Sequence, residues 1–255
     1  MFVPLHAYRL LILETQLLVL SSRLSVSKAF MSGIVRAFSD DSFDLPVRGF
    51  IHLPAGNAGD GLVLTHGAGS NANTSLLIAM AESFADAGFS VLRYDLPFRQ
   101  ARSFGPPRPG DAGRDREGLR NAVAAMQKLG SKRIFLGGHS YGGRQATMLC
   151  AEEPGLVSGL LLLSYPLHPP RKPEQLRVQH LPELRVPALF VHGTRDPFGS
   201  VEEMQSALKM IPAKTQLLIV DGAGHDLGFK GKSRDEQLVG AVARAFQDLF
   251  GDLAR

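Results

Sequence analysis

The chain has 255 residues, of which 44% are hydrophobic and 20% charged, with a formal net charge of +4 at pH 7. This length suits one large α/β domain or two small ones, with enough apolar side chains for a sizeable core. The basic residues are scattered and form no patch interleaved with aromatic residues, so nucleic acid is not an expected partner. Cys150 is the only cysteine, which excludes an intramolecular disulfide and predicts a buried thiol.

Residues 1–30 differ from the rest of the chain. They are apolar, but Arg9 and Glu14 interrupt the run, so we expect no stable membrane insertion. The segment also lacks a clean signal-peptide pattern. We interpret it as an N-terminal extension that arises either from a true start at Met31 or from organellar targeting. For 31–255 we expect a single domain in the cytoplasm.

Short apolar runs alternate with helical patterns from residue 45 onward. Several runs are uniformly apolar, as is typical of strands covered on both faces. This alternation predicts a doubly wound, mostly parallel sheet. The expected strands are Val47–Leu53, Gly61–Thr65, Ser90–Tyr94, Arg133–Leu136, Gly159–Leu163, Ala188–His192 and Gln216–Val220. The expected helices are Thr74–Ala87, Arg114–Leu129, Tyr141–Ala151, Val201–Met210 and Arg234–Leu253.

Two longer segments, Ser103–Gly113 and Tyr165–Pro182, are rich in Pro and Gly and are expected to connect elements at the surface. The second is a candidate place for a small helical lid. It is too short to form a full lid domain, so no large lid is expected.

The stretch Gly138-His139-Ser140-Tyr141-Gly142 fits the pattern G-x-S-x-G. A strand is expected before it and a helix after it, which is the setting in which this pattern carries a nucleophile. A sharp turn there strains the serine backbone, and Gly138 and Gly142 remove the Cβ atoms that would clash. The pattern therefore predicts Ser140 as a nucleophile, against the simpler interpretation of a small residue in a glycine-rich bend.

A serine nucleophile needs a base, and the base needs an acid that orients it. Asp196 and His225 each follow a predicted strand at its carboxyl end, in the order Ser, Asp, His. We expect Asp196 as the acid, because Asp221 and Asp226 both adjoin the base in sequence. The simpler alternatives are a turn aspartate before proline and a surface-loop histidine.

Stabilisation of an oxyanion requires two N–H donors. We expect one from Tyr141, at the start of the helix, and one from Ala68, in the loop His66-Gly67-Ala68-Gly69 that follows a strand. This loop also resembles a dinucleotide-binding turn, but Ala72 stands where the third glycine belongs. We therefore expect no cofactor, and the spacing of His, Cys and carboxylates suggests no metal site.

Several further residues are candidates for the pocket around Ser140, or for structural roles near it. Phe98 and Arg99 follow a predicted strand, and Arg144 lies one turn into the serine helix. Arginines there suit an acid-bearing substrate, although simple solvation at the surface is the favoured interpretation. The candidate pocket residues are His66, Gly67, Phe98, Arg99 and His139.

From roughly residue 45 to residue 252 the sequence resembles the α/β-hydrolase superfamily. Within it, the sequence is most similar to the dienelactone-hydrolase-like branch that includes testis-expressed and NSL-complex-subunit hydrolase-like proteins. The resemblance implies the eight-stranded α/β-hydrolase sheet and the same roles for Ser140, Asp196 and His225. The chain departs from relatives at His139 and Tyr141, where arginine and methionine are frequent. The similar stretches are LTHGAGSNAN, VLRYDLPFRQ, FLGGHSYGGR, YPLHPPRKPEQLR, LFVHGTRDPFGS and DGAGHDLGF.

These features together predict a serine hydrolase that cleaves an ester or thioester of a small acyl substrate through an acyl-enzyme. One alternative is a catalytically idle hydrolase fold that acts as an interaction module. Another is peptidase or acyltransferase chemistry at the same residues. The sequence does not fix the oligomeric state.

Overall fold

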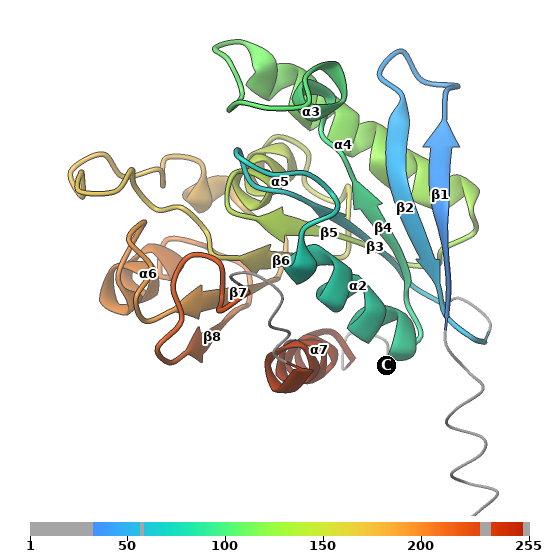
Figure 1. Ribbon diagram of the computed structural model, residues 1–255. Coiled ribbons are helices and arrows are strands. Elements are labelled where there is room, and N and C mark those ends of the chain that lie inside the picture. Colours follow the sequence, from blue (N-terminus) through green and yellow to red (C-terminus); the bar gives the residue numbers. More distant parts are fainter. Residues whose placement is uncertain (1–32, 57–58, 230–235, 252–255) are drawn as a thin grey trace, which may run out of the picture.

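The computed structural model describes residues 33–56, 59–229 and 236–251. The extension at 1–30 lies outside these ranges. The described residues form an eight-stranded sheet with the order β1-β2-β4-β3-β5-β6-β7-β8 (Figure 1). The strands are β1 (Ile34–Asp40), β2 (Val47–Leu53), β3 (Gly61–Thr65), β4 (Ser90–Tyr94), β5 (Ile134–His139), β6 (Gly159–Leu163), β7 (Ala188–Gly193) and β8 (Thr215–Val220).

β2 pairs antiparallel with both β1 and β4, and all other neighbouring strands pair in parallel. Parallel strands need crossover connections, and helices provide them on both faces of the sheet. The helices are α2 (Ser75–Asp86), α3 (Pro97–Ala101), α4 (Asp111–Lys128), α5 (Tyr141–Glu152), α6 (Val201–Leu208) and α7 (Glu236–Gly251), with a 3₁₀ turn at Leu181–Glu183. None of these helices is long and apolar enough to cross a membrane.

Alternate side chains of each central strand enter two separate cores, one on each face of the sheet. On one face, Val63 and Leu136 pack with residues of α4, α5 and α6. On the other, Leu62 and Phe135 pack with residues of α2 and α7, which lie together in Figure 1. This two-sided burial explains why the central strands are uniformly apolar in sequence.

The structure matches the seven strands expected from the sequence to within a few residues at their ends. The eighth strand, β1, was not identified from its own residues, because it is an edge strand whose Ile34 and Val35 are exposed. The helix α3 was also missed. The expectation of a helical lid within Tyr165–Pro182 is wrong, since this segment contains only turns and the beginning of the 3₁₀ turn.

The parallel strands all point their carboxyl ends to one edge of the sheet. The segments that follow β3, β5, β7 and β8 therefore meet at that edge. These segments carry His66, Ser140, Asp196 and His225. The topology thus brings together residues that are far apart in the sequence.

Candidate active site

Ser140 occupies the sharp turn between β5 and α5. Its backbone has φ 52° and ψ −115°, a conformation that costs a non-glycine residue about 1–3 kcal/mol. The flanking glycines allow this turn to pack closely. A Cβ at Gly138 would lie 2.5 Å from the Thr65 carbonyl oxygen, and one at Gly142 would lie 2.6 Å from the His66 carbonyl oxygen. The predicted steric role of both glycines is confirmed.

Ser140, His225 and Asp196 are connected by hydrogen bonds. Ser140 Oγ lies 2.8 Å from His225 Nε2, and His225 Nδ1 lies 2.8 Å from Asp196 Oδ2. The carboxylate accepts from Nδ1–H, so Nε2 is left as the acceptor for the serine hydroxyl. Ser140 and Asp196 are buried, whereas about a fifth of the His225 side chain is exposed (21%).

The two rival carboxylates have other partners. Asp221 Oδ1 accepts from the Thr194 hydroxyl at 3.3 Å, and Asp226 Oδ1 accepts from the backbone N–H of Gly228 at 3.2 Å. Asp196 also accepts from the N–H of Phe198 at 2.9 Å, which fixes its carboxylate within the turn. Asp196 is thus the aspartate that contacts His225, in agreement with its expected position at the end of β7.

Two aromatic residues contact His225, one at its ring and one at its backbone. Phe198 stacks on it, with a distance of 4.1 Å between ring centroids and an interplanar angle of 28°. His139 Nε2 donates to the His225 carbonyl oxygen at 2.7 Å. Burial lowers the pKa of His139 to about 4, and the neighbouring His225 acts in the same direction. His139 is therefore neutral at neutral pH and serves to support the loop that carries His225.

Two backbone N–H groups are available beside Ser140. Those of Ala68 and Tyr141 are not hydrogen-bonded to any other described residue, and both residues line a cavity of about 520 Å³ at Ser140. Amides that lack an acceptor next to a buried serine are suited to bind a negatively charged oxygen. The lining residues are Gly67, Ala68, Gly69, Ser70, His139, Ser140, Tyr141, Arg144, Pro166, Arg177, Phe198 and His225.

Comparison with known proteins concerns the family and the fold of the chain. Residues 58–250 match the family model described as an alpha/beta hydrolase domain. The chain belongs to the alpha/beta hydrolase family. Among solved structures, dienelactone hydrolase from Anabaena variabilis has 21% identity and a TM-score of 0.66, covering 87% of this chain and 98% of that one. The chain therefore has a fold similar to that of dienelactone hydrolase. The narrower resemblance to NSL-complex-subunit proteins stays a prediction.

Two further solved structures share the fold. Est1E from Butyrivibrio proteoclasticus has 17% identity and a TM-score of 0.66, covering 84% of this chain and 99% of that one. XC6422 from Xanthomonas campestris, described as an α/β serine hydrolase without a lid, has 14% identity and a TM-score of 0.63, covering 86% and 94%.

A curated relative is the 2-hydroxy-6-oxononadienedioate/2-hydroxy-6-oxononatrienedioate hydrolase of a Pseudomonas species. It is 32% identical over 139 residues, which are 52% of this chain and 47% of the relative. The matched region thus spans about half the length of that relative.

Three candidate pocket residues of the hydrolase lie behind the cavity and do not line it. His66, Phe98 and Arg99 are all buried. His66 donates from Nδ1 to the Gly67 carbonyl at 2.8 Å and accepts the Leu96 N–H on Nε2, and burial lowers its pKa. The expectation that they surround the substrate is corrected, because α3 turns Phe98 and Arg99 inward.

Arg99 braces the loop that carries Ala68. Its guanidinium donates to the carbonyl oxygens of Ala68 at 3.1 Å, Ser70 at 2.7 Å and Gly105 at 2.8 Å. Phe98 packs edge-on against Tyr141, with 5.8 Å between ring centroids. These contacts make α3 a support for both N–H donors.

Tyr141 has a second anchor, the buried Asp115 of α4. Its hydroxyl donates to Asp115 Oδ2 at 2.7 Å, and the other carboxylate oxygen accepts the Phe98 N–H at 3.1 Å. Burial raises the pKa values of both Asp115 and Tyr141. The atypical tyrosine after the serine is therefore fixed from outside the cavity.

Sequence reasoning missed four residues that contact the site or line its cavity, Ser70, Pro166, Arg177 and Phe198. Phe198 lies two residues after Asp196, and this proximity in sequence was the one feature that could have indicated its place at the site. Pro166 and Arg177 come from the long segment after β6, whose path no periodic pattern encodes.

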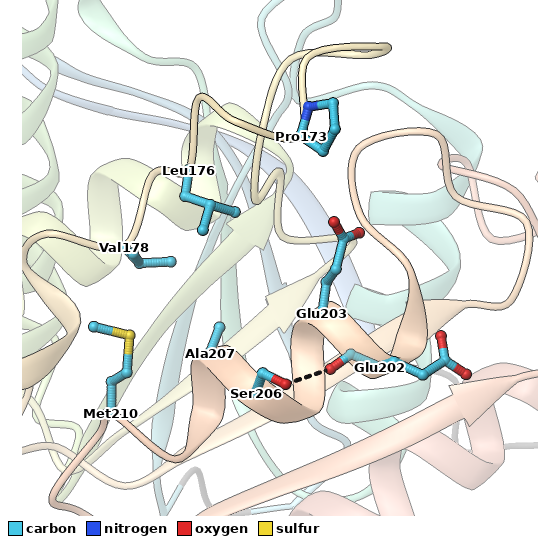
Figure 2. A pocket seen from close by; sticks show the side chains of 8 residues that line it. All are labelled: Pro173, Leu176, Val178, Glu202, Glu203, Ser206, Ala207 and Met210. Atoms are coloured by element: carbon cyan, nitrogen blue, oxygen red, sulfur yellow. Dashed lines mark hydrogen bonds between the residues drawn. The ribbon is translucent and has the colours of Figure 1, made fainter.

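A second cavity of about 340 Å³ lies between the 173–178 segment and α6 (Figure 2). Its side chains are mainly apolar, and its one hydroxyl, Ser206 Oγ, donates to the Glu202 carbonyl oxygen at 2.9 Å. No described histidine lines this cavity, and the Ser206 hydroxyl is bonded to the backbone of its own helix, so it has no partner that would activate it. In the described part of the chain, no group of three or more His, Cys, Asp or Glu side chains is arranged to hold a metal.

Proposed function

We propose that the protein hydrolyses an ester or thioester bond of a small acyl substrate through a covalent acyl-enzyme on Ser140. The observation that carries this proposal is the relay in which His225 lies 2.8 Å from both Ser140 Oγ and Asp196 Oδ2. A serine hydroxyl is a weak nucleophile unless a correctly oriented base removes its proton. The relay supplies both the base and the group that orients it.

In the acylation step, Ser140 Oγ attacks the substrate carbonyl carbon while His225 Nε2 takes the hydroxyl proton. Asp196 accepts from Nδ1–H and stabilises the imidazolium that forms. The oxyanion receives hydrogen bonds from the N–H groups of Ala68 and Tyr141. The tetrahedral intermediate then expels the alcohol or thiol, which leaves with the proton from His225.

In the deacylation step, His225 removes a proton from water, and the resulting hydroxide attacks the acyl carbonyl. The same N–H groups stabilise the second oxyanion. Collapse of this intermediate releases the carboxylic acid and returns the proton to Ser140 Oγ. The cavity opens to solvent, and water therefore reaches the acyl-enzyme.

The competing hypothesis of an idle interaction module finds less support. That hypothesis predicts a base displaced from the serine or a blocked oxyanion loop. Here His225 is hydrogen-bonded to Ser140, and the cavity reaches Ser140. Peptidase and acyltransferase activities use the same groups. Ester hydrolysis is preferred because a solved structure that shares the fold is named dienelactone hydrolase, and a lactone is a cyclic ester.

A fluorophosphonate probe tests the proposal, because it forms a stable adduct with an activated serine. We expect rapid labelling of the wild-type protein and none of Ser140→Ala. A matched control, Ser206→Ala, removes the hydroxyl of the second cavity and is expected to label like the wild type. Absence of Ser140-dependent labelling would show that the proposal is wrong.

A further inference from the structure

The cavity at Ser140 has a strongly one-sided charge. Two of its lining residues are arginines, Arg144 of α5 and Arg177 of the segment after β6, and none is Asp or Glu. Both arginines are partly buried. Two guanidinium groups that share one cavity wall without a counter-ion are suited to bind an anionic group of a ligand.

These two arginines differ from the other buried or partly buried arginines in the described part of the chain. The other buried or partly buried arginines donate to carboxylates or to backbone carbonyls. Arg116, for example, pairs with Glu152 at 3.1 Å, and Arg133 pairs with Asp60. Arg144 and Arg177 belong to no ion pair within the described ranges, and the buried Nε of Arg144 has no hydrogen-bond partner.

Among the described residues, no Asp or Glu side chain lines the cavity wall that the two arginines share. Burial raises the pKa of Tyr165 to about 12, so its hydroxyl stays neutral near Arg144. That hydroxyl donates to the Arg177 carbonyl oxygen at 2.9 Å. Burial lowers the pKa of Arg177, and the nearby Arg144 acts in the same direction. The two guanidinium groups are close enough to repel each other and would gain from an anion between them.

We propose that Arg144 and Arg177 bind a carboxylate at the far end of the acyl chain, so that the hydrolase selects acyl groups that end in an acid. Guanidinium groups match carboxylates in shape and charge and bind them through paired hydrogen bonds. This inference rests on the proposed serine chemistry only where it predicts a difference in kcat/KM between esters. Binding of the acid itself does not need the nucleophile.

The position of Arg144 sets the scale of the acyl chain. Its backbone N–H donates to the Ser140 carbonyl oxygen at 3.0 Å, one helical turn further along α5. Four residues of helix advance by about 6 Å, so Arg144 stands close to the acylated serine. A short diacid half-ester therefore spans the distance better than a long fatty acyl chain.

The kinetic test compares two esters with the same six-carbon acyl chain, the p-nitrophenyl monoester of adipic acid and p-nitrophenyl hexanoate. We expect a higher kcat/KM for the adipate ester. Arg144→Gln and Arg177→Gln are each expected to lower the adipate-to-hexanoate ratio by about tenfold, since one charge-assisted hydrogen bond is lost. Arg144→Lys is expected to recover part of the ratio, because it keeps the charge.

The matched control is Arg36→Gln, which removes the same charge from an exposed residue of β1, at the edge of the sheet. It is expected to leave the ratio unchanged. A ratio that stays the same in both arginine variants, with thermal unfolding like that of the wild type, would overturn the inference. A ratio that falls equally in Arg36→Gln would also overturn it, because it would indicate only a general charge effect.

A binding test separates this inference from the proposed function. Ser140→Ala is titrated calorimetrically with monomethyl adipate and with neutral dimethyl adipate. We expect the acid to bind more tightly and the preference to disappear in Ser140→Ala/Arg144→Gln. If the fluorophosphonate probe fails but this preference is seen, the serine mechanism is wrong and the anion subsite stands. If the two esters bind equally, the subsite is wrong whatever the probe shows.

Discussion

At the scale of single residues, the site depends on a strained serine that its neighbours hold in place. Ser140 has a positive φ in the turn between β5 and α5, and the glycines on either side of it pack closely against Thr65 and His66. Gly142 is central to this turn, since its Cα packs directly against Thr65 and His66. His139 and Phe198 then support the histidine that faces the serine.

The close packing at Gly142 predicts the effect of adding one methyl group. In Gly142→Ala the new Cβ would lie 2.5 Å from Thr65 Cγ2 and 2.6 Å from the His66 carbonyl oxygen, and the backbone must move. We expect a loss of about 1–3 kcal/mol in the free energy of unfolding, measured in urea, together with slower labelling of Ser140. The control is Gly113→Ala in α4, where a Cβ meets nothing within 4 Å. It is expected to be neutral or slightly stabilising, and equal effects at both glycines would contradict the steric explanation.

At the scale of elements, α3 links the two proposed oxyanion donors. It holds the Ala68 loop through Arg99 and reaches Tyr141 through Phe98. The sequence did not predict α3, because a five-residue helix that begins at Pro97 has too few turns to show a periodic pattern. The inward orientation of Phe98 and Arg99 follows from this helix, so their expected place over the substrate was wrong for the same reason.

The bracing role of Arg99 predicts a catalytic defect without direct substrate contact. Arg99→Lys keeps the charge but loses the fork that reaches several carbonyl oxygens at once. We expect kcat for ester hydrolysis to fall about tenfold with a smaller change in KM, since the Ala68 N–H acts mainly on the transition state. The control is Arg102→Lys, which affects the neighbouring pair with Asp111. A rise in KM alone would indicate that Arg99 shapes the pocket and does not align the N–H donor.

The sequence predicted the central elements well and the periphery poorly. Uniformly apolar runs such as Gly159–Leu163 identify strands because both faces of the sheet are covered. Ser140, Asp196 and His225 were found because strand ends and chain order constrain them. Arg177 was not found, since its place in the cavity depends on the path of a loop that lacks regular structure. Irregular loops are fixed by tertiary contacts, which no local pattern encodes.

At the scale of the whole molecule, burial keeps several histidines neutral. Burial lowers the pKa values of His52, His139 and His180 to about 4, with help from nearby Arg93, His225 and Arg144 respectively. In the unfolded chain these groups take up protons near pH 6.5. The unfolded state therefore binds more protons than the native state between pH 6.5 and pH 4.

The native protein is expected to lose stability as the pH falls through that window. His52 offers a test remote from Ser140, because its Nε2 accepts from Arg93 Nε at 2.8 Å and a glutamine can accept in its place. In His52→Gln we expect the drop in the free energy of unfolding between pH 7 and pH 4.5 to shrink by about 2 kcal/mol. Urea unfolding at several pH values measures this difference. Parallel stability curves for the two proteins would show that His52 titrates normally in the native state.

The turns of the 165–182 segment have a consequence for the fate of the acyl group. A helical lid would have to open and close in each cycle, and it would shield the acyl-enzyme from solvent while closed. Here that segment contributes Pro166 and Arg177 to the cavity wall and forms no helical lid. Water is therefore the acyl acceptor that is present throughout the cycle. For the proposed acyl-enzyme, transfer to another alcohol or amine would have to outcompete bulk solvent, which favours hydrolysis over acyl transfer.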